Sequence, residues 1–65
     1  MFSFLQDVFA DAGTRRLAHE EALNAIRAYG SGSVEHLEMR RRRTESRHRR
    51  QIYRLAIAMV PKLTQ

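Results

Sequence analysis

The sequence predicts an all-α protein with two to three helices, folded as a helical hairpin with a long arginine-rich C-terminal helix. Three observations predict this class. Apolar residues recur at spacings of three and four, apolar and polar residues nowhere alternate with period two for long, and arginine, alanine, glutamate and leucine predominate. Two glycine sites divide the chain into three helical segments, and 65 residues are enough for one small domain.

The first predicted helix spans roughly residues 4–12. Phe2, Leu5 and Phe9 recur there at helical intervals and form an apolar stripe. We expect this stripe to pack in the core, with a groove on a partner protein as the alternative. Gly13 is only a weak break, because one glycine inside a helix costs about 1 kcal/mol relative to alanine.

The second predicted helix spans roughly residues 14–29. Thr14 is its candidate N-cap, and Gly30 stands where a C-terminal cap belongs. Residues 30–33 then form a flexible linker, whose last residue, Ser33, is the candidate cap of the next helix. Small apolar residues of the second helix form a stripe that ends in an aromatic ring: Ala18, Ala22, Ala25, Ile26 and Tyr29.

The third predicted helix is long, roughly 34–60, because neither glycine nor proline interrupts the chain between the linker and Pro61. At 1.5 Å per residue it would extend for about 40 Å. Residues that precede Ile52 on the same helical line are mostly polar, so the middle of this helix does not fit a dry core. A bend near Thr44 or Ser46 is the alternative to a straight helix, because their hydroxyls compete for backbone groups.

Basic charge is concentrated in the third helix. Between Arg40 and Arg54 there are eight arginines and one glutamate, a formal charge of +7, whereas the rest of the chain carries −2 and the whole chain +5. On a straight helix five of these arginines share one face over roughly 21 Å. This arginine ladder consists of Arg40, Arg43, Arg47, Arg50 and Arg54, and Arg41, Arg42 and Arg49 flank it.

These features predict a small basic binding protein that contacts the nucleic-acid backbone, with RNA slightly preferred over DNA. The arginine ladder has the reach to follow several phosphates, and no acid lies on its line, whereas ordinary surfaces intersperse both charges. In composition the segment resembles arginine-rich RNA-binding helices, although no family motif accompanies it. An acidic protein surface and a merely solvated helix face are the alternatives.

A second function class is that of an accessory or regulatory subunit that docks on a larger complex through its apolar faces. A chain of this length buries only about 60% of its unfolded surface and has no cysteine for disulfides. We therefore expect a homo-oligomer or a subunit of a complex. The predicted protein interface consists of Phe2, Leu5, Phe9, Ile52, Leu55 and Met59.

Catalytic and metal-binding patterns are not found in the sequence. There is no cysteine nucleophile, no Gly-x-Ser-x-Gly elbow and no glycine-rich phosphate loop, so we expect neither an enzyme nor a cofactor. Glu45 and His48 have a spacing used in di-iron bundles, but arginines surround them and we predict no metal. Tyr53 lies between arginines and could stack on a base, although base-stacking proteins usually offer several aromatic rings.

No apolar stretch approaches the roughly 20 residues that a membrane-spanning helix needs. The start of the chain lacks the basic flank and cleavage site of a secretory signal, and we expect a cytoplasmic protein. Adhesion to an anionic membrane is disfavoured, because the arginine-rich and apolar parts of the third helix are offset along the chain.

Overall fold

The structure, a computed structural model, describes residues 11–65 and is all-α there. The predicted fold class, a helical hairpin, is confirmed. The first predicted helix falls almost entirely before the described residues, and Phe2, Leu5 and Phe9 lie outside them. The elements in chain order are α2 (Ala12–Tyr29), the 3-10 turn η1 (Gly30–Gly32), α3 (Ser33–Arg43) and α4 (Arg47–Leu63).

Helix α2 begins two residues earlier than predicted, with Asp11 and not Thr14 as its N-cap. Asp11 Oδ1 accepts a hydrogen bond from the backbone N–H of Thr14 at 2.7 Å. Because this bond favours the charged carboxylate, it lowers the pKa of Asp11 below its ordinary value. Gly13 is absorbed into the first turn, and buried Thr14 instead uses its hydroxyl across the fold, 3.1 Å from His48 Nε2.

Gly30 ends α2, as predicted. Its φ of 55° lies in the region that residues with a Cβ avoid, and its N–H donates to the carbonyl oxygen of Ile26. The segment that follows is not the irregular linker predicted over residues 30–33, because Gly30–Gly32 form one 3-10 turn and α3 begins directly after it. The prediction of Ser33 as a side-chain cap is wrong: Ser33 is the buried first residue of α3, and the N-cap is Gly32.

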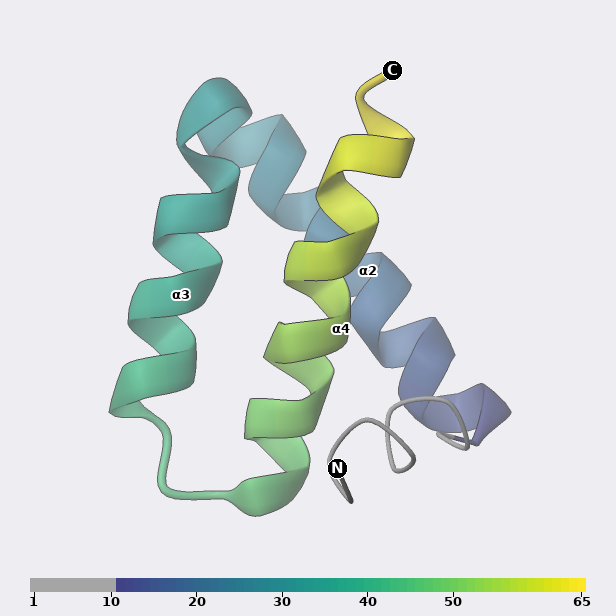
Figure 1. Ribbon diagram of the computed structural model, residues 1–65, viewed down its shortest axis with the longest axis vertical. Coiled ribbons are helices and arrows are strands. Elements are labelled where there is room, and N and C mark those ends of the chain that lie inside the picture. Colours follow the sequence, from purple (N-terminus) through teal and green to yellow (C-terminus); the bar gives the residue numbers. More distant parts are fainter. Residues whose placement is uncertain (1–10) are drawn as a thin grey trace.

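The prediction of one straight helix over residues 34–60 is wrong. Helix α3 ends at Arg43, α4 begins at Arg47, and residues 44–46 reverse the chain so that α3 and α4 run side by side in opposite directions (Figure 1). The physical reason is burial, since a straight helix would carry the apolar end of α4 away from α2. Folding back lets α3 and α4 both pack on α2, and burial of each large aliphatic side chain contributes about 1.5–3 kcal/mol.

The break lies at residues 44–46, where the sequence predicts a bend as the alternative to a straight helix. Short polar side chains there replace the helical hydrogen bonds that are lost. Thr44 and Ser46 have extended backbone, with ψ of 141° and 124°. Ser46 Oγ accepts from the N–H of Arg49 at 3.2 Å and caps α4, and Thr44 Oγ1 accepts from the N–H of Ser46 at 3.4 Å. Arg50 Nε donates to the carbonyl oxygen of Thr44 at 3.3 Å and so closes the end of α3.

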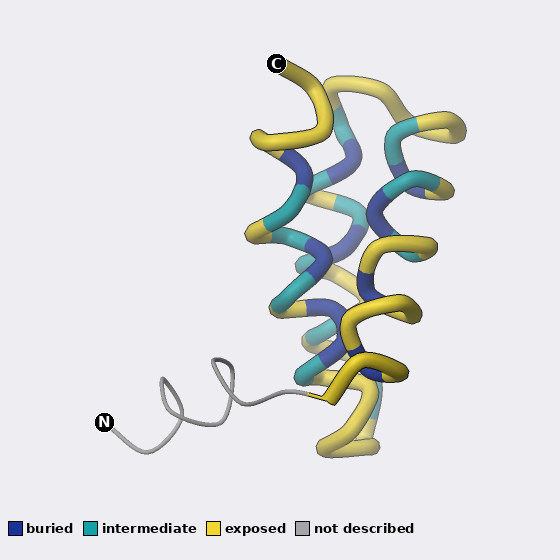
Figure 2. The backbone as a smooth tube through the Cα atoms, turned by 90° about the vertical axis from the view of Figure 1, so that its right-hand side faces the viewer, coloured by how far each residue is buried: buried dark blue, intermediate teal, exposed yellow. Residues whose placement is uncertain are grey.

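The core lies where α4 meets both α2 and α3, and Figure 2 shows buried residues along the sides of the helices that face one another. The predicted alanine stripe of α2 is buried, and these small side chains let the helices approach closely. Tyr29, at the end of that stripe, is 53% exposed. The buried apolar residues are Ala18, Ala22, Ala25, Leu37, Ile52, Tyr53, Ala56 and Val60.

Helix α4 continues through Pro61 to Leu63, so the prediction that the helix ends before the proline is wrong. Proline lacks an N–H, but near a helix end the loss of one hydrogen bond is tolerated when other groups close the turn. Thr64 does so, since its N–H and its hydroxyl donate to the carbonyl oxygen of Val60 at 3.1 Å and 2.9 Å.

Candidate nucleic-acid interface

The reversal at residues 44–46 gathers the arginines at one end of the molecule. Four of them occupy the last turn of α3 and three the first turn of α4, while Arg54 lies four residues beyond Arg50, about 6 Å further along α4 at 1.5 Å per residue. All are exposed except Arg41, which is half-buried. We call this cluster the arginine corner; it consists of Arg40, Arg41, Arg42, Arg43, Arg47, Arg49, Arg50 and Arg54.

The prediction that five arginines form a ladder along one straight helix is wrong. Arg40 and Arg43 belong to α3, whereas Arg47, Arg50 and Arg54 belong to α4, which runs the opposite way (Figure 1). The five side chains therefore do not form one row along a helix face. Their positive charge surrounds the turn between two helices, so a partner would meet a compact cationic end and not a straight track.

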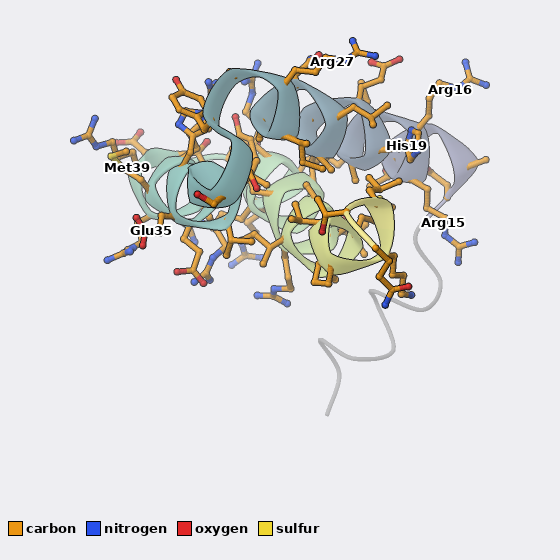
Figure 3. All side chains as sticks on the ribbon, turned by 90° about the horizontal axis from the view of Figure 1, so that it is seen from above. Arg15, Arg16, His19, Arg27, Glu35 and Met39 are labelled. Atoms are coloured by element: carbon orange, nitrogen blue, oxygen red, sulfur yellow. The ribbon has the colours of Figure 1, made fainter. Side chains whose placement is uncertain are left out.

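Helix α2 brings two more arginines, Arg15 and Arg16, to this end of the molecule. The hydrogen bond between Thr14 and His48 places the first turn of α2 beside the first turn of α4, and the charged carboxylate of Asp11 caps the α2 end there. Arg15 and Arg16 project outward from the same part of α2 (Figure 3). Sequence reasoning missed these two arginines, because nothing local links residues 15 and 16 to a segment that lies more than 20 positions away.

Tyr53 holds Arg40 in place at the edge of the arginine corner. Arg40 Nε donates to Tyr53 Oη at 3.2 Å, and Arg40 Cζ lies 5.5 Å from the centroid of the tyrosine ring. The hydrogen bond to Tyr53 raises the pKa of Arg40 above its ordinary value. The ring of Tyr53 is only 3% exposed, so its suggested role of stacking on a base is wrong.

An open cavity of about 390 Å³ lies between α3 and α4, next to Arg40. Its lining residues come from one side of α3, from the start of the break and from α4. At the α3 side the ring of His36 is stacked on Tyr29, with 4.1 Å between the ring centroids and 25° between the planes. We call this cavity the α3–α4 groove; it is lined by His36, Met39, Arg40, Arg43, Thr44, Arg49 and Tyr53.

The three described residues of the predicted protein interface pack within the protein's own fold. Ile52 is 7% exposed and belongs to the core. Leu55 and Met59 are half-buried and pack against that core. Large apolar side chains that are exposed come from all three helices and not from one face of α4: Leu17, Tyr29, Met39 and Leu63.

Within residues 11–65, no group of three or more histidine, cysteine, aspartate or glutamate side chains is placed to hold a metal ion. Glu45 lies in the break and His48 in α4, so the two do not share one helix. No helix in this part of the chain is long and apolar enough to cross a membrane.

Comparison of the chain with protein-family models, with curated proteins and with solved structures finds no match.

Proposed function

We propose that this protein binds the phosphate backbone of a nucleic acid through the arginine corner. The observation that carries the proposal is the charge segregation: residues 40–54, which include the break between α3 and α4, carry a formal +7, while the chain outside them carries a net −2. Arginine guanidinium groups offer paired donors that match phosphate oxygens. Each phosphate that they neutralise also releases condensed counterions, which supplies affinity without reading the base sequence.

The crowding of like charge supports a polyanionic partner over a merely solvated surface. Seven arginines occupy two adjoining helical turns, the last turn of α3 and the first turn of α4, and charges repel with little screening over roughly 8 Å at physiological ionic strength. Their repulsion is unfavourable for the free protein and is relieved when phosphates bind. Glu45 is the one acid among residues 40–54, and Glu21 of α2 acts on Arg40 from outside that segment, so acids are few beside eight arginines.

The burial of Ile52 argues against the subunit alternative, because the α4 face expected to dock on a partner is used in the protein's own core. An acidic protein surface would meet the same arginines and is the competing partner. The preference for RNA over DNA rests on the likeness to arginine-rich RNA-binding helices, and the experiment therefore compares both nucleic acids.

The first test removes charge from the corner without disturbing its hydrogen bonds. Arg43 and Arg47 are exposed, and Arg43→Ala/Arg47→Ala is expected to weaken the binding of labelled RNA and DNA measured by fluorescence anisotropy. If each arginine contacts one phosphate, the slope of log affinity against log salt should fall by about two units.

The matched control removes two charges at the other end of the molecule. Arg27 and Lys62 lie in the last turns of α2 and α4, away from the corner (Figure 1). Arg27→Ala/Lys62→Ala should leave the salt slope nearly unchanged. Equal losses from both pairs would show that only total charge matters. No binding by the unsubstituted protein below roughly 100 µM at moderate salt would overturn the proposal, and binding to an acidic protein under the same conditions would replace it.

A further inference from the structure

The α3–α4 groove combines a cationic end with an aromatic end. Arg40, Arg43 and Arg49 line it beside the break, and His36 lies one helical turn before Arg40 on α3. The imidazole of His36 is stacked on Tyr29, which is itself more than half exposed. Aromatic rings beside arginines are the combination with which proteins bind single-stranded nucleic acid, since bases stack on the rings while cations follow the backbone.

The guanidinium of Arg40 is preorganised to bind an anionic ligand. Its Nε is engaged by the hydroxyl of buried Tyr53, so the guanidinium has a defined position beside the groove. A guanidinium carries five N–H donors in total, and the bond to Tyr53 uses the one on Nε. A fixed guanidinium loses less conformational entropy on binding than a mobile one.

The dimensions of the groove suit one nucleotide and not a duplex. Its volume of about 390 Å³ falls at the lower end of the range of small-ligand pockets. The bases of a duplex are stacked on one another, so they do not reach a cavity of this kind unless they are turned out of the helix. An unpaired nucleotide meets no such barrier.

We propose that the α3–α4 groove holds an unpaired nucleotide, with its phosphate at Arg40, Arg43 and Arg49 and its base against His36, whose ring is stacked on Tyr29 outside the groove lining. The inference rests on the proposed binding of nucleic-acid backbone by the arginine corner and adds the form of the ligand. The protein is then a binder of single-stranded RNA or DNA. Affinity comes from the corner, and the preference for unpaired strands comes from the stacked rings.

The test compares a short labelled single strand with an abasic strand that has the same number of phosphates, using the full chain and fluorescence anisotropy. The two strands offer the same charge, so any difference reports contacts to bases. The unsubstituted protein should bind the base-bearing strand roughly tenfold more tightly than the abasic strand. It should also prefer that strand to a duplex of equal length.

Two variants assign the difference to the groove. Tyr29→Ala/His36→Ala should lower affinity for the base-bearing strand to that of the abasic strand and leave abasic binding unchanged. Tyr29→Phe keeps the stacking ring and should behave like the unsubstituted protein. Leu17→Ala removes an exposed apolar side chain from the same helix outside the groove and is the matched control. Circular dichroism checks that each variant is folded.

The outcomes separate this inference from the function on which it rests. Equal binding of base-bearing and abasic strands by the unsubstituted protein would overturn the groove inference, whatever the variants do. If Arg43→Ala/Arg47→Ala still weakened both strands, backbone binding would stand without the groove. Failure to bind any strand would overturn both proposals.

Discussion

Individual side chains at the arginine corner differ in what they do for the fold. Arg40 and Arg50 donate hydrogen bonds that hold the structure, to Tyr53 Oη and to the carbonyl oxygen of Thr44. Substitution of either residue would therefore change stability together with binding, and the two effects would be difficult to separate. Arg43 is exposed and lies at the end of α3, which makes it a cleaner site for testing the interface.

At the residue scale, Gly30→Ala should destabilise the protein by about 1–2 kcal/mol. Nothing lies within 4 Å of the position of the added Cβ, so the cost comes from the φ of 55° alone. Gly32→Ala is the control, because the φ of Gly32 is −89° and its added Cβ would lie 3.9 Å from Tyr29 Cβ, an ordinary contact. Urea unfolding followed by circular dichroism measures both. An equal free energy of unfolding for the two variants would contradict the backbone argument.

At the scale of helices, α4 shows how one segment serves both the core and the interface. Its first turn is arginine-rich and exposed, whereas Ile52, Ala56 and Val60 recur at spacings of four and are buried. The arginine-rich turn can remain in solvent because Ser46 Oγ accepts a hydrogen bond from the backbone N–H of Arg49, which has no partner within the helix. The start of α4 therefore depends on a local hydrogen bond more than its end does.

Ser46→Ala should lower the free energy of unfolding by about 1 kcal/mol, because the N–H of Arg49 loses its acceptor at the start of α4. Ser46→Asp supplies another acceptor and should restore most of the loss. Ser31→Ala, in the exposed 3-10 turn, is the control and should be nearly neutral. Chemical denaturation compares the three variants. A neutral Ser46→Ala would mean that packing against α2, and not the cap, determines where α4 begins.

At the scale of the whole molecule, the positions of the charges oppose stability in the free protein. The corner collects like charges from two helices, and the adjoining N-terminus of α4 adds positive potential. The small core, in which three of eight buried apolar residues are alanines of α2, has little excess stability to offset that repulsion. A partner that neutralises the charge of the arginine corner would therefore raise the stability of the folded protein when it binds.

The thermal unfolding midpoint should consequently rise by a few degrees between roughly 20 and 300 mM sodium chloride, as salt screens the corner. Arg43→Ala/Arg47→Ala should unfold at a higher temperature than the unsubstituted protein at low salt, and the difference should shrink as salt increases. Arg27→Ala/Lys62→Ala should lack this pattern. Scanning calorimetry across the salt series measures it, and a midpoint that is independent of salt would contradict repulsion at the corner.

The sequence by itself determined the helical class, the end of α2 at Gly30, the buried alanine stripe and the concentration of charge in residues 40–54. These features depend on local spacing, on capping and on composition. It misplaced the start of α2, because Asp11 and Thr14 are both good caps and only the fold engages Thr14 with His48.

Only the tertiary structure decided that residues 34–60 form two helices, that Tyr53 and Ile52 belong to the core, and that the arginines form a corner and not a ladder. The chain near Thr44 and Ser46 is locally compatible with either a helix or a break, since their hydroxyls satisfy the backbone in the broken form. Burial of α4 against α2 favours the break. The α3–α4 groove exists only because of that choice, as the residues that line it come from two helices that a straight chain would keep apart.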